Sequence, residues 1–163
     1  TDSFVPLREE VEFIDNYLDI EVVRFGKDKL RVVKELDPAS LDVMVPSMLL
    51  QPLVENSIKH GLASMVEGGS IYLRSRLSET RLVIEVEDDG VGMAARQPDS
   101  GRGAGIGMAN ISERLHVLYG DTALMTIDSH EGKGTLVRIR LPRLQAMGAV
   151  PEGFYEERSI TRR

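Results

Sequence analysis

Four polar residues at helical spacing in the segment 51–61 have side chains that could bind a cation or a phosphate. Glu55 and Lys59 are four residues apart, as are Asn56 and His60, so a helix places all four on one broad face. A Glu–Lys pair is routine on a solvated helix face. Asn beside a carboxylate is less routine, because its oxygen suits Mg²⁺, which takes one or two protein oxygens and completes its shell with phosphates and water. The segment therefore indicates either a plain solvated face or one end of a metal–phosphate site.

A short acidic run followed by two glycines forms a second candidate, the segment 87–93 (EDDGVGM). The run ends a segment of alternating apolar residues, so Asp88 is expected at the end of a strand. A surface turn is one interpretation. In the other, Asp88 faces a pocket, while Gly90 and Gly92 let the backbone approach a flat ligand closely.

Two further segments are rich in glycine, 101–110 (GRGAGIGMAN) and 132–135 (GKGT). Glycines just before a helix allow backbone N–H groups to surround a phosphate, although a flexible linker has the same composition. A Rossmann site is excluded because no tightly joined strand precedes the first segment and no βαβ repeat follows it. A Walker loop is excluded because Gly-Lys-Ser/Thr does not occur. The segment 132–135 alone predicts only a hairpin turn.

Composition excludes several classes of protein. The chain has 163 residues, 42% of them hydrophobic, which is enough for the core of one domain. Its net charge of −6 argues against a general nucleic-acid binder, and the absence of Cys excludes disulfides and thiolate sites. No stretch approaches a membrane span and the first residues do not resemble a signal peptide, so we expect a cytoplasmic domain. The chain starts without Met and in the middle of a sequence pattern, which suggests that it is a piece of a longer protein.

Periodicity and turn residues place these segments in an α+β two-layer sandwich, with helices on one face of a mostly antiparallel sheet. A first helix is expected from Pro6 to Gly26, either as an ordinary amphipathic helix or as the end of a longer coiled or bundled one. The other expected helices cover 46–61, with Pro52 as a kink or as the true start, and 108–119. The expected strands cover 30–36, 70–77, 81–88, 123–127 and 136–141. Residues 89–107 are expected to form a long loop, and residues 143–163 a mobile tail.

The order and spacing of the four motifs resemble the ATP-binding catalytic domain of sensor histidine kinases, in the GHKL (HATPase) superfamily shared with Hsp90, type II topoisomerases and MutL. Glu55-Asn56 with Lys59-His60 is similar to the N box, and Asp88-x-Gly90-x-Gly92 to the G1 box. Gly103-x-Gly105-x-Gly107 is similar to the G2 box, and Gly134-Thr135 to the last short motif. The segments 5–10 (VPLREE), 17–18 (YL), 24–26 (RFG) and 50–56 (LQPLVEN) are similar to the LytS/YehU-like subgroup.

This resemblance implies the Bergerat ATP-binding fold, ATP and Mg²⁺ as cofactors, and a role for each motif. Asp88 would accept a hydrogen bond from the adenine amino group, supported by Thr135 directly or through water. Asn56 would hold Mg²⁺ and Glu55 would be the catalytic residue that orients or deprotonates the attacking group. The glycine-rich segment 101–107 would form a mobile lid over the triphosphate. The implied ATP-binding residues are Asn56, Lys59, His60, Asp88, Gly90, Gly92, Met93, Gly101, Gly103, Gly105, Ile106, Gly107, Met108 and Thr135.

The resemblance also implies a phosphorelay. Such a domain donates the γ-phosphate of ATP to a His on an upstream dimerisation domain, for relay to a response regulator in a two-component system. None of the three histidines, His60, His116 and His130, lies in the context of the acceptor. We therefore expect residues 1–26 to continue from a missing acceptor region, 27–142 to form the catalytic domain, and the full-length kinase to be a homodimer and an inner-membrane sensor. The alternatives are a stand-alone regulator of the anti-sigma serine-kinase type and a non-enzymatic nucleotide-binding module.

Overall fold

The computed structural model describes residues 3–26, 28–93 and 98–143, with the side chains of 98–106 left aside. A five-stranded sheet forms one layer, and its strands run in the spatial order β2 (Leu30–Leu36), β4 (Gly69–Leu77), β5 (Arg81–Asp88), β7 (Gly134–Pro142) and β6 (Leu124–His130). β2 pairs with β4 in parallel, and the other three pairs are antiparallel. The predicted mixed, mostly antiparallel sheet is confirmed.

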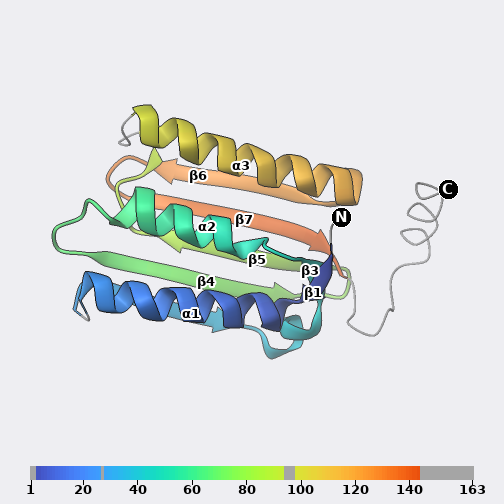
Figure 1. Cartoon of the computed structure of the whole chain (residues 1–163). Coiled ribbons are helices and arrows are strands. Elements are labelled where there is room, and N and C mark those ends of the chain that lie inside the picture. Colours follow the sequence, from blue (N-terminus) through green and yellow to red (C-terminus); the bar gives the residue numbers. More distant parts are fainter. Residues whose placement is uncertain (1–2, 27, 94–97, 144–163) are drawn as a thin grey trace.

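Three helices form the second layer, all on one face of the sheet (Figure 1). They are α1 (Leu7–Phe25), α2 (Leu50–Asn56) and α3 (Pro98–Tyr119), and a π-helical segment, η2 (Ser57–Leu62), continues α2. The short segments η1 (Pro38–Asp42) and η4 (Gly120–Thr122) are 3₁₀ turns in the connections. None of the helices in the described part of the chain is long and apolar enough to cross a membrane. The α+β two-layer prediction is confirmed.

One hydrophobic core joins the two layers. Each helix contributes buried apolar side chains, and they pack on alternate residues of the central strands, as in Leu82, Ile84 and Val86 of β5. Helix α1 takes part through Leu7, Val11, Ile14 and Leu18. Residues 4–25 therefore pack on the same core as the sheet. The expectation that an upstream region continues from this helix stays a prediction.

The structure corrects the expected start of the second helix. Strand β3 (Met44–Pro46) pairs with β1 (Phe4–Pro6) in a small antiparallel sheet. Because Pro46 belongs to this strand, the helix expected to start there begins at Leu50 instead. The N–H of Leu7 also donates a hydrogen bond to the carbonyl of Val43, which holds the same two chain segments together. A three-residue strand gives too little alternation to be recognised from sequence.

The structure also corrects the expected loop at 89–107, because α3 already begins at Pro98 and includes the glycine-rich segment. Each glycine lowers helix propensity by about 1 kcal/mol relative to alanine, and this favours a loop in a sequence-based prediction. Pro98 and Asp99 suit the first turn of a helix, and they provide a start that the glycine content conceals. The tail expected at 143–163 lies outside the described residues, apart from Arg143.

The carboxylate of Glu10 connects α1 to the start of α2. It is 8% exposed and accepts hydrogen bonds from the backbone N–H groups of Met48 (3.0 Å), Leu49 (2.8 Å) and Leu50 (3.2 Å). These groups precede or open α2, where a helix has no internal acceptors for its first N–H donors. A carboxylate is favoured there by both hydrogen bonding and the helix dipole. Glu10 therefore fixes where α2 starts.

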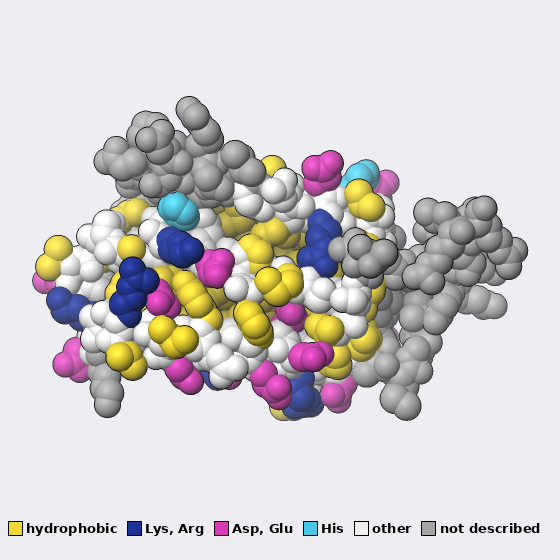
Figure 2. Space-filling model, in the orientation of Figure 1, with side chains coloured by type: hydrophobic (Ala, Val, Ile, Leu, Met, Phe, Trp, Pro, Cys, Tyr) yellow, Lys and Arg dark blue, Asp and Glu magenta, His cyan; other side chains and the backbone are white. Residues whose placement is uncertain are grey.

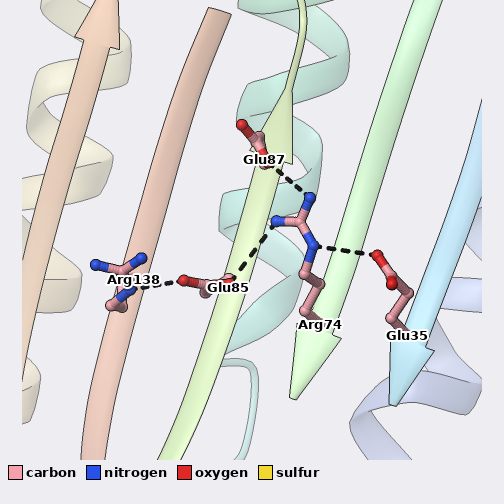
Figure 3. Close-up of polar contacts among 5 residues, drawn as sticks. All are labelled: Glu35, Arg74, Glu85, Glu87 and Arg138. Atoms are coloured by element: carbon pink, nitrogen blue, oxygen red, sulfur yellow. Dashed lines mark hydrogen bonds and ion pairs between the residues drawn. The ribbon is translucent and has the colours of Figure 1, made fainter. Parts of the chain in front are cut away.

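An ion-pair network covers the face of the sheet opposite the helices (Figure 3). Arg74 of β4 contacts Glu35 of β2 at 3.2 Å and Glu87 of β5 at 2.8 Å. Glu85 of β5 lies between Arg74 at 3.7 Å and Arg138 of β7 at 2.6 Å. The network thus bridges four adjacent strands. Opposite charges on neighbouring strands favour one register over its alternatives.

The Glu10 contacts predict a large loss of stability on truncation. Replacing Glu10 by Ala leaves the buried N–H groups of Leu49 and Leu50 and the part-buried N–H of Met48 without their acceptor, and it should lower the free energy of unfolding by about 2–3 kcal/mol. The control Glu12→Ala removes an exposed carboxylate of the same helix and should change this free energy by less than about 0.5 kcal/mol. Urea unfolding followed by circular dichroism measures both values. Equal losses in the two variants would contradict the role assigned to Glu10.

Candidate functional site

The four polar residues of the N-box-like segment gather around one cavity. Glu55, Asn56, Lys59 and His60 line it, together with Gly107 and Met108 at the facing part of α3. Figure 2 shows basic, acidic and histidine side chains intermixed over the end of the α2 region on the helix-covered face. The structure thus brings these predicted site residues together, and it also places Gly107 and Met108 beside them.

The sequence predicts a single α-helix through residue 61, but the last turn of the observed helix is not α-helical. Residues 57–62 are π-helical, and the N–H of Ala63 donates to the carbonyl of Ile58 at 2.9 Å, five residues earlier. A π-turn is wider than an α-turn and is found frequently at functional sites. It changes the angle at which Lys59 and His60 leave the helix relative to Glu55 and Asn56. Sequence periodicity has no signal for this change.

Asp88 lies at the end of β5, only 1% exposed, in a cradle of glycines. Its Oδ1 accepts a hydrogen bond from the N–H of Gly90 at 2.9 Å. A Cβ atom at Gly61 would lie 2.7 Å from the same oxygen. A Cβ at Gly90 would collide with the carbonyl oxygen of Gly61, and one at Gly134 with that of Asp88. Gly61 and Gly90 therefore pack against the carboxylate and Gly134 packs against the backbone of the same residue, and a Cβ at any of these three positions would collide with a neighbour.

Gly61 is a site residue missing from the predicted set, where it is only the last residue of the helix expected over 46–61. Its carbonyl oxygen accepts a hydrogen bond from the N–H of Val91 at 3.0 Å, which ties the end of η2 to the segment after Asp88. The sequence signal that could have indicated a role for Gly61 is its position directly after the segment that carries the four polar site residues.

A row of three polar side chains crosses the end of the sheet. Asp88 of β5 is the cross-strand partner of Thr135 of β7, and Thr135 is the partner of Ser129 of β6. The hydroxyl oxygens of Ser129 and Thr135 lie 2.8 Å apart. Thr135 is 4% exposed, so the row is largely enclosed. Ser129 was missed because a single Ser in an exposed-looking strand carries no sequence signal.

The segment after Asp88 is fixed to the β6–β7 hairpin. The N–H of Met93 donates to Ser129 Oγ at 2.8 Å, and the N–H of Gly132 donates to the carbonyl of Val91 at 2.9 Å. Gly92 has φ of +81°, and a Cβ there would collide with the carbonyl oxygen of His130. The predicted close backbone approach at Gly92 thus occurs, and its partner is the hairpin.

The carboxylate of Glu55 lies near the interface between α2 and α1. Its Oε1 accepts a hydrogen bond from Gln51 Nε2 at 3.1 Å. The pKa of Tyr17 on α1 is raised to about 12, first by burial and then by the negative charges of Glu21 and Glu55, while the charge of Arg24 opposes the shift. Tyr17 therefore stays protonated throughout the physiological range, and it lies within electrostatic reach of Glu55.

The remaining glycine-rich residues and the other two histidines do not line the described part of this cavity. The backbone of Gly101, Gly103, Gly105 and Ile106 is helical within α3, and their side chains lie outside the described residues. His116 lines a different cavity with Arg81 and Asp121, at the opposite end of α3. His130 is exposed and contacts Asp128 at 2.9 Å. Of the three histidines, only His60 lines the cavity at α2.

Comparison with known proteins agrees with this arrangement. The sequence profile of histidine kinase-, DNA gyrase B- and HSP90-like ATPases matches residues 42–145. The chain is 32% identical over 140 residues to sensor histidine kinase YesM of Bacillus subtilis, and 32% identical over 152 residues to the sensor protein LytS of Oceanobacillus iheyensis. The alignments cover 86% and 87% of this chain but 24% and 26% of those proteins, so the chain spans about a quarter of their length.

Solved structures show the same fold. The catalytic domain of histidine kinase ThkA matches with a TM-score of 0.64 at 17% identity, over 88% of this chain and 99% of that chain. The expected LytS-like subgroup and the expected ATP-binding catalytic domain of histidine-kinase type are both confirmed. The chain belongs to the family of histidine kinase-, DNA gyrase B- and HSP90-like ATPases.

Proposed function

We propose that this domain binds MgATP between α2, α3 and the end of the sheet, and that it donates the γ-phosphate to a histidine on another domain of the full-length kinase. The observation that carries the proposal is the buried carboxylate of Asp88, held at the end of β5 by glycine contacts with the segment that carries Glu55 and Asn56. A base-binding group and phosphate-binding groups are thereby joined through one rigid contact.

Asp88 and Thr135 would form the adenine end of the site. An ionised carboxylate accepts hydrogen bonds but donates none, which matches the amino group at position 6 of adenine. Guanine has a carbonyl oxygen there, so two acceptors would face each other. The glycine contacts support this role because they keep Asp88 fixed at the end of β5.

Asn56, Lys59 and His60 would form the phosphate end. No cluster of three or more His, Asp or Glu side chains suited to a metal ion occurs among the described residues. A cavity lined by Asn56, the carboxylate of Glu55, the ammonium of Lys59 and the imidazole of His60 fits Mg²⁺ held mainly by phosphate oxygens, with Asn56 supplying a protein oxygen. Bound there, Mg²⁺ would neutralise charge on the phosphates during transfer. Lys59 is exposed and free to reach a phosphate from the rim.

Glu55 would orient or deprotonate the acceptor imidazole. Phosphoryl transfer depends mostly on positioning and charge stabilisation, so a carboxylate held by Gln51 beside the phosphate site suits the role. The acceptor would lie outside this chain, because His116 and His130 lie away from the cavity and His60 would contact phosphate. The helical segment 101–107 would cover the triphosphate.

The wider assignment rests on the relatives, which are sensor kinases. The proposed partners are an upstream acceptor and dimerisation domain and a response regulator. The full-length protein would be a homodimeric sensor in the inner membrane, with this domain in the cytoplasm.

Base selectivity tests the role of Asp88. We expect ATP or ADP to bind well over tenfold tighter than GTP, because facing acceptors cost on the order of 1–3 kcal/mol. Asp88→Asn keeps the shape but replaces one acceptor oxygen with a donor, and it should reduce the ratio of the two affinities. The control Asp19→Asn changes an exposed residue of α1 and should leave the ratio unchanged. Titration calorimetry measures both affinities, and equal binding of ATP and GTP by the unaltered chain would refute the assignment.

Nucleotide titrations with and without Mg²⁺ test the role of Asn56. Asn56→Ala should weaken binding of MgATP by about tenfold and binding of metal-free ATP much less, because only the first uses the amide oxygen. Asn16→Ala removes an exposed amide of α1 and serves as the control. A loss of the same size in both titrations would mean that Asn56 has only a structural role.

A further inference from the structure

Two buried polar atoms, one on α1 and one on α2, have no hydrogen-bond partner within the described part of the chain. They are the hydroxyl oxygen of Tyr17 and the side-chain oxygen of Gln51. Buried polar atoms in native proteins are nearly always paired, either with protein or with a bound water molecule. A phenol hydroxyl can donate its hydrogen and an amide oxygen can only accept one, so the two groups are chemically complementary.

The packing of α1 on α2 brings these two side chains to the same place. Glu10 contacts the N–H of Leu49 at the start of α2, and the two helices then run side by side in the same direction (Figure 1). Tyr17 follows Glu10 by seven residues, close to two full turns, so it lies on the same face of α1 and about 10 Å farther along. Helical side chains lean toward the N-terminus, so the Tyr17 ring reaches back over the turn between Gln51 and Glu55.

The other end of the Gln51 amide is already committed to Glu55. Its Nε2 donates to Glu55 Oε1 at 3.1 Å, and a carboxylate has no hydrogen to give in return. The amide oxygen is therefore directed elsewhere and is left as an acceptor. Tyr17 keeps its proton at neutral pH, because its pKa is raised to about 12, first by burial and then by the charges of Glu21 and Glu55. Its O–H is thus available to this acceptor.

We propose that Tyr17 is a positioning residue for Glu55, and that it donates its O–H to the side-chain oxygen of Gln51, directly or through one water molecule. This rests on the proposed function, in which Glu55 orients or deprotonates the acceptor imidazole. The bond fixes the Gln51 amide, so its N–H stays on one oxygen of Glu55 and the other oxygen is left for the imidazole. The first helix thereby becomes part of the active site.

Glu21 is the competing acceptor for the Tyr17 hydroxyl. It lies one turn farther along α1, is 5% exposed, and its carboxylate is 3.6 Å from the guanidinium of Arg24. A bond from Tyr17 to Glu21 would join two residues of the same helix and would not act on Glu55. The two possibilities differ in whether the effect of the hydroxyl depends on Gln51, and this difference can be measured.

The experiment measures phosphate transfer from radiolabelled ATP to the acceptor histidine of the full-length kinase. Tyr17→Phe removes only the hydroxyl and should lower the maximal rate roughly three- to tenfold. The KM for ATP should change by less than about twofold, because the hydroxyl acts on Glu55 and not on the nucleotide. Tyr72→Phe is the matched control, since it removes a phenol hydroxyl beside Arg74 on the opposite face of the sheet.

A double variant tests whether Tyr17 acts through Gln51. Gln51→Met keeps the size of the side chain without its amide and should lower the maximal rate at least as much as Tyr17→Phe. In the presence of Gln51→Met, Tyr17→Phe should cause no further loss, because the hydroxyl then has no amide to hold. Both substitutions exchange a buried polar group for an apolar one of similar size, so we expect the variants to fold.

Each result has a distinct meaning. An unchanged maximal rate in Tyr17→Phe would overturn the proposal. A further loss of the same size in the presence of Gln51→Met would also overturn it, and this is the result expected if the hydroxyl binds Glu21. An unchanged rate in Glu55→Gln, or no transfer by the unaltered kinase, would instead overturn the proposed function on which the proposal rests.

Discussion

The close packing of three chain segments around Asp88, two of them at its carboxylate and one at its backbone, is the constraint on which the rest of the site depends. Gly61 at the end of η2, Gly90 after β5 and Gly134 at the start of β7 approach within distances that exclude any side chain. Interiors transmit strain because they are close-packed, so a contact of this kind fixes the helix layer relative to the sheet. The proposed base-binding carboxylate and the proposed phosphate-binding segment are therefore held at a fixed position relative to each other.

The two ends of this unit are supported by different parts of the fold. The start of α2 is set from α1 by Glu10, which provides acceptors for the first N–H groups of the helix. The row formed by Asp88, Thr135 and Ser129 depends on strand register, because a slip of one residue would turn all three side chains to the other face. On the opposite face, the ion pair between Glu85 of β5 and Arg138 of β7 favours the observed register of the two strands that carry Asp88 and Thr135. Surface groups far from the cavity thus help to align it.

The sequence predicted what depends on local pattern and on motif order, and missed what depends on tertiary contacts. Alternation and turn residues were sufficient for the five strands, and the spacing of the motifs identified Asp88, Asn56 and Thr135 as candidates. The early start of α3 was missed because glycine content favours a loop, and the π-turn was missed because it leaves no periodic signal. Gly61, Ser129 and the capping role of Glu10 were missed since each acts across more than 25 positions of the chain.

A crystal structure of this chain with Mg²⁺ and a non-hydrolysable ATP analogue tests the central claim most directly. The account predicts that the adenine amino nitrogen lies within about 3.2 Å of an Asp88 carboxylate oxygen, with the triphosphate extending toward Asn56, Lys59 and His60. Movement of the segment 101–107 is compatible with this result, because the claim concerns the contact between Asp88 and the base. An analogue whose base lies away from Asp88, with the glycine contacts intact, would contradict the account.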